Sequence, residues 1–511
     1  MLSRDAARDL DALTSWHDDW TGIRAVVLGL GVTGFAAADT LVELGANVTV
    51  VAERGDAERE RILSVLGIDT VVTDAGETPD VLAAAELVIA SPGLPPTHPW
   101  LVGAAERGAT IWGDVELAWR VRDKVRAAEW VLVTGTNGKT TTTQLAAHML
   151  QAGGLRVAPV GNIGTPVLDA VRDPEGFDVL VVELSSFQLH ALGEIWPHSA
   201  VCLNLDDDHL DWHAGAQAYR DAKAKVYRNA RVAAVYNVAD PATMRMVEEA
   251  DVVEGCRAIG FGLGMPGRSE LGIVEGILAD RAFLDDRRDS ALELATLADL
   301  EVAGLATPHM AQNVLAAAAL ARAVGVEPAA IRDAIRSFRL DHHRTEVVAD
   351  IGGVRFVDDS KATNPHAANG SLQAFASVVW IVGGLLKGVD VAPLVERHAA
   401  RLRAAVVIGV DRAAILAAFA RHAPGIPLVE VDEADTEEVM PTAVAAARAH
   451  ASSGDTVLLA PAAASMDQFE SYADRGRRFQ RAVHDERMRE GGADGPGGGG
   501  RTPDPGGPRS R

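Results

Sequence analysis

The sequence predicts an α/β protein of three domains, each built on a largely parallel sheet. Short apolar runs, often rich in Val, recur along the chain, and most are followed by Gly or polar residues and then by an Ala- and Leu-rich stretch. This alternation is typical of strands that crossover helices bury on both faces. A chain of 511 residues, 48% of them hydrophobic, is long enough for several domains of ~100 to 200 residues.

The domain boundaries are placed where one series of strands gives way to the next. We expect one boundary near residue 118 and a second near residue 340, which gives domains at 1–118, 119–340 and 341–490. Residues 491–511 are dominated by Gly and Pro, a composition that buries almost nothing, so we predict a disordered tail. The predicted strands are the apolar runs at 25–28, 48–52, 87–90, 130–133, 179–182, 201–205, 378–382, 404–407 and 457–460.

Charge and cysteine content exclude several classes of function. The net charge of −23 repels nucleic-acid phosphates and anionic membranes, so nucleic acid is not expected as a partner. Two cysteines cannot form a disulfide framework, which favours a reducing compartment. The amino terminus lacks the apolar stretch of a signal peptide, and no uncharged apolar run approaches the ~20 residues that cross a bilayer. We therefore expect a cytoplasmic protein without membrane insertion.

A first glycine loop, GLGVTG, lies between an apolar run and a helical stretch and contains Gly29, Gly31 and Gly34. Such a turn exposes the N–H groups of a helix amino terminus to a phosphate. The pattern alone leaves three interpretations open: a redox dinucleotide, another phosphate ligand, or a structural turn. Glu53 follows the second predicted strand, where a ribose-binding acid would stand, so NAD is not excluded by the pattern.

A second glycine loop, VLVTGTNGKTTTT, is a stronger signal. Its backbone N–H groups can surround phosphates, Lys139 can neutralise them, and the Thr140 hydroxyl can bind Mg²⁺. The usual phosphate-loop consensus has Gly at the position of Val133, so this loop is a shortened variant. We predict a nucleoside triphosphate site here.

Acidic and imidazole side chains follow two later strands. Glu183 ends the run at 179–182, where it can either bind the magnesium ion or cap the next helix. The segment from Asp206 to His213 contains four aspartates and two histidines, including His209. This segment suits a second metal or a general base, or it is a solvated acidic loop.

Helical periodicity singles out Lys223. In AQAYRDAKAKVYRNA it falls on the apolar stripe of the helix, whereas Lys225 points away. A buried amine needs a partner or a changed charge. The alternative is a lysine whose stem lies on the core while its ammonium reaches solvent.

Cations and hydroxyls follow three strands of the last domain. FVDDSKATN supplies Asp359, Lys361 and Thr363, and WIVGGLLKG supplies Lys387. The segment APAAASMDQFESYADRG adds Ser465 and Tyr472. Together they would suit a substrate that bears carboxylates, although exposed lysines without a role are the simpler explanation.

Taken in order, these motifs resemble the Mur ligase family over roughly residues 25 to 485. The matching segments are GTNGKTTT, ELSSFQL, DDDHLDWH, YRDAKAKVY, HMAQN, HHR, DDSKATN, VGGLLKG and SMDQFESYADRG. The combination of DSKATN with DQFESYADRG is similar to the members that add D-glutamate. The resemblance implies a Rossmann-like first domain, a P-loop NTPase-like central domain and a Rossmann-like last domain. It further implies an ATP-dependent, amide-forming ligase of cytoplasmic peptidoglycan precursor synthesis, and we expect a monomer.

The implied reaction joins D-glutamate to UDP-N-acetylmuramoyl-L-alanine through an acyl phosphate, and the resemblance assigns residues to each partner. Lys139, His209 and Lys223 would be catalytic, with Lys223 carbamylated by CO₂. Two Mg²⁺ ions would be held by Thr140, Glu183, His209 and Lys223. ATP would contact Gly135, Thr136, Asn137, Gly138, Lys139, Thr140, Thr141, Asn313, Arg344 and Asp359. The UDP precursor would contact Val32, Thr33, Arg54, Ser91, Gly93, Asn162 and Ser185, and D-glutamate would contact Lys361, Thr363, Lys387, Ser465 and Tyr472.

The sequence also leaves competing functions to be tested. A nicotinamide-dependent oxidoreductase would rest on GLGVTG and Glu53 alone and would leave the second loop unexplained. A nucleotide-gated binding protein would use the second loop but not Lys361, Lys387 and Ser465. Folylpolyglutamate synthesis is the nearest alternative within the ligases, and the first domain argues against it.

Overall fold

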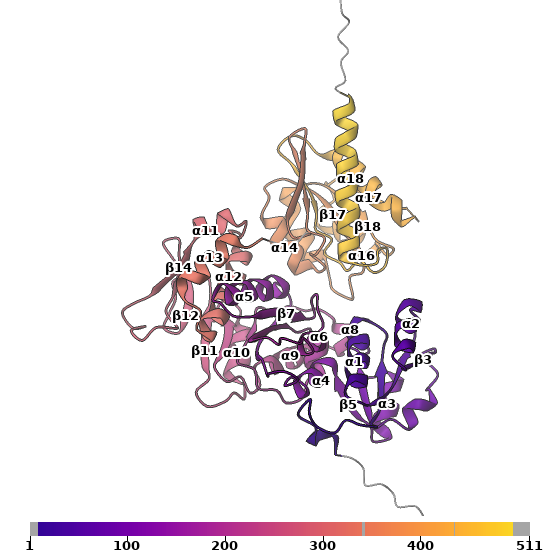
Figure 1. The fold of residues 1–511 in the computed structure, drawn as a ribbon. Coiled ribbons are helices and arrows are strands. Elements are labelled where there is room, and N and C mark those ends of the chain that lie inside the picture. The colour runs from indigo at the N-terminus through magenta and orange to yellow at the C-terminus, as the bar shows by residue number, and fades with distance from the viewer. Residues whose placement is uncertain (1–8, 340–342, 434, 494–511) are drawn as a thin grey trace, which may run out of the picture. The chain divides into compact units, whose positions relative to one another are not determined.

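A computed structural model describes residues 9–339, 343–433 and 435–493. The chain divides into two compact units, residues 1–340 and 341–511. The first unit carries two sheets and the second carries one (Figure 1). The predicted α/β class is confirmed, since parallel strands alternate with helices in each sheet.

The first sheet is parallel, with five strands in the order β3-β2-β1-β4-β5. Its order changes direction between β1 and β4, and in open α/β sheets such a switch point forms a crevice at the carboxyl ends of the strands. The strands are β1 (Arg24–Leu28), β2 (Asn47–Ala52), β3 (Asp69–Val72), β4 (Leu87–Ala90) and β5 (Thr110–Gly113), and the helices are α1 (Val32–Glu43), α2 (Ala57–Val65), α3 (Pro99–Glu106) and α4 (Asp114–Arg120).

The second sheet has nine strands in the order β14-β13-β12-β11-β10-β9-β6-β8-β7, parallel from β7 to β12 and antiparallel beyond. Its strands are β6 (Glu129–Thr134), β7 (Val157–Gly161), β8 (Val179–Glu183), β9 (Ser199–Cys202), β10 (Ala233–Asn237), β11 (Arg257–Phe261), β12 (Glu270–Val274), β13 (Ile277–Asp280) and β14 (Leu292–Thr296). The helices are α5 (Lys139–Ala152), α6 (Val167–Val171), α7 (Ser186–His190), α8 (Leu210–His213), α9 (Ala216–Ala224), α10 (Pro241–Glu248), α11 (Leu297–Val302), α12 (Pro308–Val324) and α13 (Pro328–Ser337).

The two sheets of the first unit share one continuous hydrophobic core. Trp119 of α4 packs edge-on against Trp130 of β6, with ring centroids 5.1 Å apart. Buried side chains of both sheets belong to the same packed cluster. The helix α4 passes through residue 118, so the boundary predicted there lies within a helix that contacts both halves.

The second unit is a six-stranded sheet in the order β15-β16-β20-β17-β18-β19, with only β15 antiparallel to its neighbour. The strands are β15 (Glu346–Ile351), β16 (Val354–Asp358), β17 (Val378–Gly383), β18 (Leu402–Ile408), β19 (Leu428–Glu430) and β20 (Thr456–Leu459). The helices are α14 (Pro365–Gln373), α15 (Ala392–His398), α16 (Ala413–His422), α17 (Thr436–His450) and α18 (Tyr472–Ala493).

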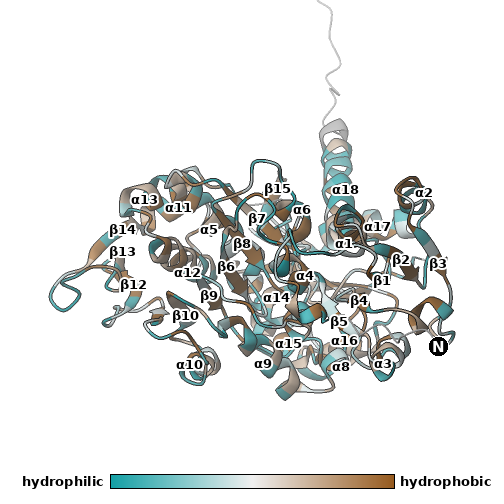
Figure 2. Cartoon of the chain, turned by 60° about the horizontal axis from the view of Figure 1, so that its bottom comes forward, coloured by the Kyte–Doolittle hydropathy of each residue, from teal (hydrophilic) through white to brown (hydrophobic). Residues whose placement is uncertain are grey.

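Burial follows the hydrophobic pattern of the sequence. Figure 2 shows β6 and β8 in the brown of apolar residues, whereas α18 is largely hydrophilic. None of the helices in the described ranges combines the length and the apolar surface that crossing a membrane requires.

Two sequence-based expectations need correction. The strand expected at 201–205 ends at Cys202, because the chain beyond it leaves the sheet toward the second glycine loop. The predicted tail begins too early, since α18 continues to Ala493. The rest of the predicted tail, 494–511, lies outside the described residues.

The glycines of the first loop have distinct steric roles. Gly29 has φ of +101°, and a Cβ on it would lie 2.5 Å from the Ser91 Oγ. A Cβ on Gly34 would lie only 2.0 Å from the Gly29 carbonyl oxygen, whereas a Cβ on Gly31 would meet open space. Gly34 therefore allows α1 to pack on β1, and Gly31 leaves room above the helix amino terminus.

We expect Gly34→Ala to lower the free energy of unfolding by about 1–3 kcal/mol, because its Cβ must displace the backbone at Gly29. Gly103→Ala in α3 is the matched control: its Cβ meets only the flexible end of Arg107, so the gain in helix propensity should stabilise by about 0.5–1 kcal/mol. Urea unfolding of both variants measures the contrast. Equal effects in the two variants would contradict this account of Gly34.

Candidate functional site

The amino terminus of α1 is open toward the crevice of the first sheet. Gly31 caps the helix without a side-chain hydrogen bond, and Val32 is 55% exposed. Thr33 is half-buried beside it. The first N–H groups of α1 thus face open space, which is the arrangement that binds an anion.

The other residues predicted to contact the UDP precursor lie on loops of the first unit. Arg54 is exposed just after β2, and Gly93 is exposed in the loop after β4. Ser185 caps α7 and accepts a hydrogen bond from the Gln188 N–H at 3.2 Å. Asn162, after β7, donates from Nδ2 to Glu183 Oε1 at 2.9 Å.

The backbone carbonyls of the second glycine loop accept hydrogen bonds from Lys139. Gly138 has φ of +81° at the start of α5, and a Cβ on it would lie 2.4 Å from the Asn313 Oδ1. Lys139 donates from Nζ to the carbonyls of Gly135 and Thr136, at 3.0 and 2.9 Å. Asn313 of α12 therefore packs against the loop.

Polar partners from the segment after β9 and from α9 hold this loop in place. The Asn137 N–H donates to Asn204 Oδ1 at 2.8 Å, and Asn204 Nδ2 donates to the Asn137 carbonyl at 3.2 Å. The hydroxyls of Thr136 and Tyr219 lie 2.9 Å apart. Thr140 and Thr141 are buried in the first turn of α5. The sequence did not single out Asn204, which is a polar residue in the apolar run VCLNL.

Glu183 is a buried carboxylate with one unused oxygen. It is 1% exposed at the end of β8 and pairs in register with Val133 of β6, which leads into the phosphate loop. Its Oε1 accepts from Asn162, while its Oε2 has no hydrogen-bond partner among the described residues. A buried carboxylate oxygen without a donor fits a bound cation, so Glu183 suits Mg²⁺.

Lys223 is buried, as the helical periodicity predicts. It is 2% exposed, and its Nζ donates to the Gly135 carbonyl at 2.8 Å and to Thr134 Oγ1 at 3.3 Å. Burial, together with the nearby positive charge of Lys139, lowers the pKa of this amine to about 7. Near neutral pH much of the Lys223 amine is therefore uncharged, directly beneath the phosphate loop.

His209 lies at the start of α8 with φ of +51°. Its Nε2 is 3.6 Å from Asp208 Oδ2, and its ring packs edge-on against Phe187 with centroids 4.7 Å apart. The neighbouring His213 lies 2.9 Å from Ser186 Oγ, and burial lowers its pKa to about 4. His209 is thus the accessible imidazole of this segment, while His213 is a packed, neutral one.

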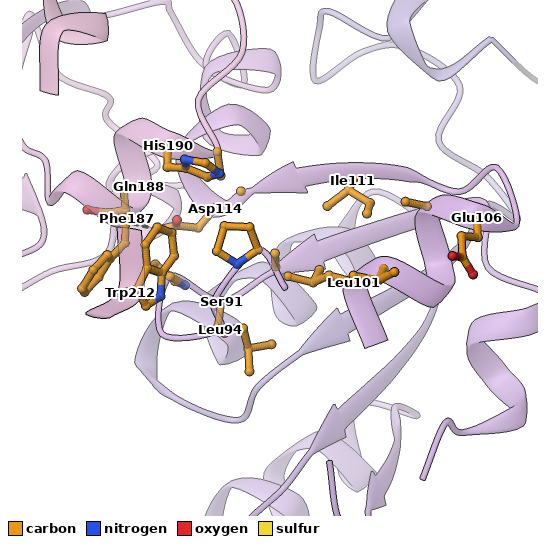
Figure 3. Close-up of a pocket in the computed structure, with 17 residues that line it drawn as sticks. Ser91, Leu94, Leu101, Glu106, Ile111, Asp114, Phe187, Gln188, His190 and Trp212 are labelled. Atoms are coloured by element: carbon orange, nitrogen blue, oxygen red, sulfur yellow. Dashed lines mark hydrogen bonds between the residues drawn. The ribbon is translucent and has the colours of Figure 1, made fainter. Parts of the chain in front are cut away.

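A cavity of about 430 Å³ connects the two halves of the first unit (Figure 3). Asp114 and Gln188 provide polar groups in its wall, with Gln188 Nε2 donating to Asp114 Oδ2 at 3.1 Å. Burial raises the pKa of Asp114 to about 6. Hydrophobic and aromatic side chains form most of the remaining wall: Leu94, Leu101, Val102, Ile111, Phe187 and Trp212.

This cavity lies between the two sets of predicted residues. Ser91 lines it and also packs its Oγ against Gly29 of the first loop. Phe187 also lines the cavity and packs edge-on against His209. The sequence did not indicate Asp114, Gln188 or Trp212, because only the packing of α4, α7 and α8 brings them together.

In the second unit, the residues predicted to contact D-glutamate follow three adjacent parallel strands. Lys361 and Thr363 follow β16, Ser465 follows β20, and Lys387 follows β17. The Lys361 Nζ lies 4.9 Å from the centre of the Tyr472 ring. The structure therefore brings this set to one edge of the sheet.

A buried arginine fixes this edge. Arg475 is fully buried and donates to the Ser360 hydroxyl and carbonyl at 3.0 and 2.8 Å, and to the Ala463 carbonyl at 3.2 Å. The Ser360 hydroxyl donates in turn to the Tyr472 carbonyl at 2.7 Å. Burial lowers the pKa of Arg475 to about 10. The motif YADRG contained this arginine, but its sequence gave no sign of burial.

A hydrogen-bond network surrounds the backbone next to Arg344. His343 Nδ1 lies 2.6 Å from Asp358 Oδ2, and the His343 N–H donates to Glu346 Oε2 at 2.9 Å. Gln480 donates to both carboxylates, at 3.0 and 2.9 Å. His343, Glu346 and Asp358 lie within metal-binding distance of one another. However, the Gln480 amide already donates to one oxygen of each carboxylate. We interpret the cluster as a structural network that positions the turn.

Asp359, predicted at the ATP phosphates, lies beside this turn. Its Oδ1 accepts from the Thr345 N–H at 3.1 Å, and the Ser371 hydroxyl donates to its Oδ2. Burial raises the pKa of Asp359 to about 6, opposed by that hydroxyl. Arg344 also contributes to the electrostatic environment of this carboxyl.

Three family models match the chain in sequence. Residues 23–113 match the Mur ligase MurD-like N-terminal domain, residues 133–321 match the Mur ligase middle domain, and residues 343–463 match the Mur ligase glutamate ligase domain. The order of the three matches is the order of the three sheets.

Curated relatives are similar over nearly their whole length. A protein of Leifsonia xyli subsp. xyli is 62% identical over 491 residues, covering 93% of this chain and 95% of the relative. A protein of Streptomyces avermitilis is 54% identical, covering 91% and 98%. Both relatives are named UDP-N-acetylmuramoylalanine--D-glutamate ligase.

Solved structures share the fold at lower identity. The UDP-N-acetylmuramate-alanine ligase MurC of Thermotoga maritima is 21% identical, with a TM-score of 0.54, covering 90% of this chain and 99% of that one. The MurF ligase of the same organism, solved in complex with ADP, is 20% identical, with a TM-score of 0.53, covering 92% and 96%.

Proposed function

The chain belongs to the Mur ligase family, and from that premise we propose that it joins D-glutamate to UDP-N-acetylmuramoyl-L-alanine at the expense of ATP. Relatives that are 62% and 54% identical over the aligned residues carry the name of this ligase. The chain is accordingly an enzyme of peptidoglycan precursor synthesis. The nicotinamide oxidoreductase is set aside, because the curated relatives are named as ligases and an oxidoreductase would leave the second glycine loop unexplained.

One structural observation supports this proposal most directly. The cavity beside Ser91 touches the first glycine loop through Ser91 and reaches His209 through Phe187. A nucleotide whose diphosphate lies at the amino terminus of α1 could therefore extend its sugar and peptide through the cavity toward the phosphate loop. A dinucleotide cofactor or an isolated nucleoside triphosphate would make no use of this connection.

The reaction follows from the chemistry of the substrates. A carboxylate is a poor electrophile, so the alanyl carboxylate first attacks the γ-phosphorus of ATP, which forms an acyl phosphate and releases ADP. Lys139 offsets negative charge on the transferred phosphoryl group, and the loop orients it. The amine of D-glutamate then attacks the acyl carbon, loses a proton, and expels inorganic phosphate from the tetrahedral intermediate.

Four side chains would hold magnesium beside the phosphate loop: Thr140, Glu183, His209 and carbamylated Lys223. The donor set fits, because it contains hydroxyl, carboxylate and imidazole groups, and Glu183 keeps one buried oxygen without a donor. Bound magnesium would offset the charge of the phosphates during transfer. The chain's own contribution is to orient these ligands, which it does through the bond from Asn162 to Glu183 and the packing of His209 on Phe187.

Lys223 meets the condition for carbamylation. Its Nζ must be neutral to attack CO₂, and burial lowers its pKa to about 7. Attack forms the N–C bond and releases one proton, which converts the amine into a carboxylate-bearing anion. That anion would face the positive charge of Lys139, so the two lysines would no longer repel each other.

The second unit would bind the amino acid. Lys361 and Lys387 supply positive charge for the two carboxylates of D-glutamate, while Thr363 and Ser465 supply hydroxyl groups. Arg344 and Asp359 would reach the ATP phosphates. We further propose a cytoplasmic monomer, because both cysteines are free thiols and a single chain supplies every residue of the scheme.

The decisive test is the dependence of product formation on each substrate. We expect phosphate release from ATP only when UDP-N-acetylmuramoyl-L-alanine and D-glutamate are both present, with one phosphate per lengthened nucleotide. A coupled phosphate assay with mass spectrometry of the product measures this. Release that is independent of D-glutamate, or selective for another amino acid, would contradict the proposal.

Lys139→Ala should abolish turnover, with kcat reduced at least 100-fold, because the loop loses the lysine that follows it directly and contacts the carbonyls of both Gly135 and Thr136. Lys225→Ala is the matched control, since its Nζ donates to the His190 carbonyl at the surface, and it should keep near wild-type kcat. The assay above measures both. Activity of the Lys139 variant within tenfold of wild type would exclude this role.

Lys223→Ala should be inactive and partly rescued by acetate or another short carboxylate, because the acid can replace the carbamate in the space left by the side chain. Wild-type protein labelled with ¹³C-bicarbonate should show a carbamate resonance that weakens as the pH falls below about 7, where Lys223 becomes protonated. Absence of the resonance in wild-type protein, together with failure of every acid to rescue, would exclude carbamylation.

A further inference from the structure

A carboxylate stands beside the first glycine loop without a role in the scheme above. Glu53 directly follows β2, whose last residue is Ala52. The Gly29 N–H donates to the Val51 carbonyl at 2.7 Å, so the loop and Glu53 leave neighbouring parallel strands at the same edge of the sheet. Glu53 therefore lies at the carboxyl edge of the sheet, one strand away from the switch point between β1 and β4.

A buried histidine orients this carboxylate. His98 caps α3, is 7% exposed, and packs edge-on against the Trp100 ring with centroids 4.9 Å apart. Its Nδ1 accepts from the Trp100 N–H at 3.3 Å, so the ring proton resides on Nε2. That Nε2–H faces Glu53 Oε1 at 2.9 Å and donates to it.

The second oxygen of Glu53 is available to a ligand. The Glu53 side chain is 45% exposed, and within the described part of the chain His98 is its sole hydrogen-bond partner. A salt bridge made only for stability would gain little at such exposure. His98 instead fixes one carboxylate oxygen of Glu53, so that the other oxygen is an oriented hydrogen-bond acceptor that faces solvent.

The neighbouring cation makes this acceptor compatible with an anionic ligand. Arg59 of α2 donates from Nη1 to the Leu30 carbonyl at 2.9 Å, which places a guanidinium against the glycine loop itself. Positive charge thus lies at the loop, where a diphosphate would bind, and negative charge lies at the end of β2. In Rossmann-type sheets a carboxylate at that position, about 20 residues beyond the glycine loop, binds the ribose hydroxyls.

We propose that Glu53 is a specificity residue of the precursor site, where its free oxygen accepts a hydrogen bond from the ribose 2′-hydroxyl of the uridine nucleotide. This inference rests on the proposed function. His98 is the positioning residue that fixes the carboxylate. The pair would let the enzyme distinguish ribonucleotide from deoxyribonucleotide precursors.

The test compares UDP-N-acetylmuramoyl-L-alanine with its 2′-deoxyuridine analogue. Wild-type enzyme should use the analogue with about tenfold lower kcat/KM at unchanged kcat. In Glu53→Ala the natural precursor should lose a similar factor, so that the ratio of the two precursors falls to about one, while the KM values for ATP and D-glutamate stay the same. Glu58→Gln, an exposed glutamate in the first turn of α2, is the matched control and should keep the wild-type ratio.

Each alternative outcome is separately visible. A Glu53→Ala enzyme that still discriminates tenfold against the deoxy analogue would overturn the assignment, and loss of discrimination against an N3-methyluracil precursor instead would move the contact to the base. Calorimetric binding of UDP and 2′-deoxy-UDP to wild type and Glu53→Ala gives the same ratio without turnover. The two assays therefore separate the two ideas. If the wild-type enzyme shows no turnover but still binds UDP more tightly than 2′-deoxy-UDP, the proposed function is refuted and the contact of Glu53 is not.

Discussion

The pairing of β6 with both β8 and β9 is the constraint on which the catalytic half depends. Because the three strands are parallel, their carboxyl ends meet at one edge, and the phosphate loop, Glu183 and Asn204 emerge there together. Lys223 reaches the same edge from α9 and bonds the Gly135 carbonyl. Displacing one strand by a residue would move these groups to different faces.

The sequence predicted those features of this sheet edge that show as a pattern within a short segment of the chain. Apolar runs located nine of the strands but not the parallel strands β3, β5, β7, β10, β11 and β19, and a helical stripe identified Lys223 as buried. The strands β12 to β14, which pair with one another antiparallel, escaped prediction because they are short and mix polar with apolar residues, as Glu270–Val274 and Leu292–Thr296 do. Asn204, Gln188 and Gln480 escaped because their partners lie far away in the chain, where only tertiary packing decides the contact.

The charge at the two glycine loops differs in sign from the net charge of the chain. The chain carries a net charge of −23, yet cationic side chains contact both glycine loops: Arg59 at the first, and Lys139 and Lys223 at the second. The local charge, not the total, then determines which anions can bind. Burial contributes as well, since it keeps Asp114 and Asp359 partly protonated near pH 6 and Lys223 partly neutral near pH 7.

The buried guanidinium of Arg475 joins the segments after β16 and β20 to the start of α18. A planar group with several fixed donors allows little independent sliding of the segments that it bridges. The bonds of Arg475 therefore hold Lys361, Ser465 and Tyr472 at a defined spacing within the second unit. Specificity for a different amino acid would then arise by exchange of side chains, while the backbone segments that Arg475 joins keep their positions.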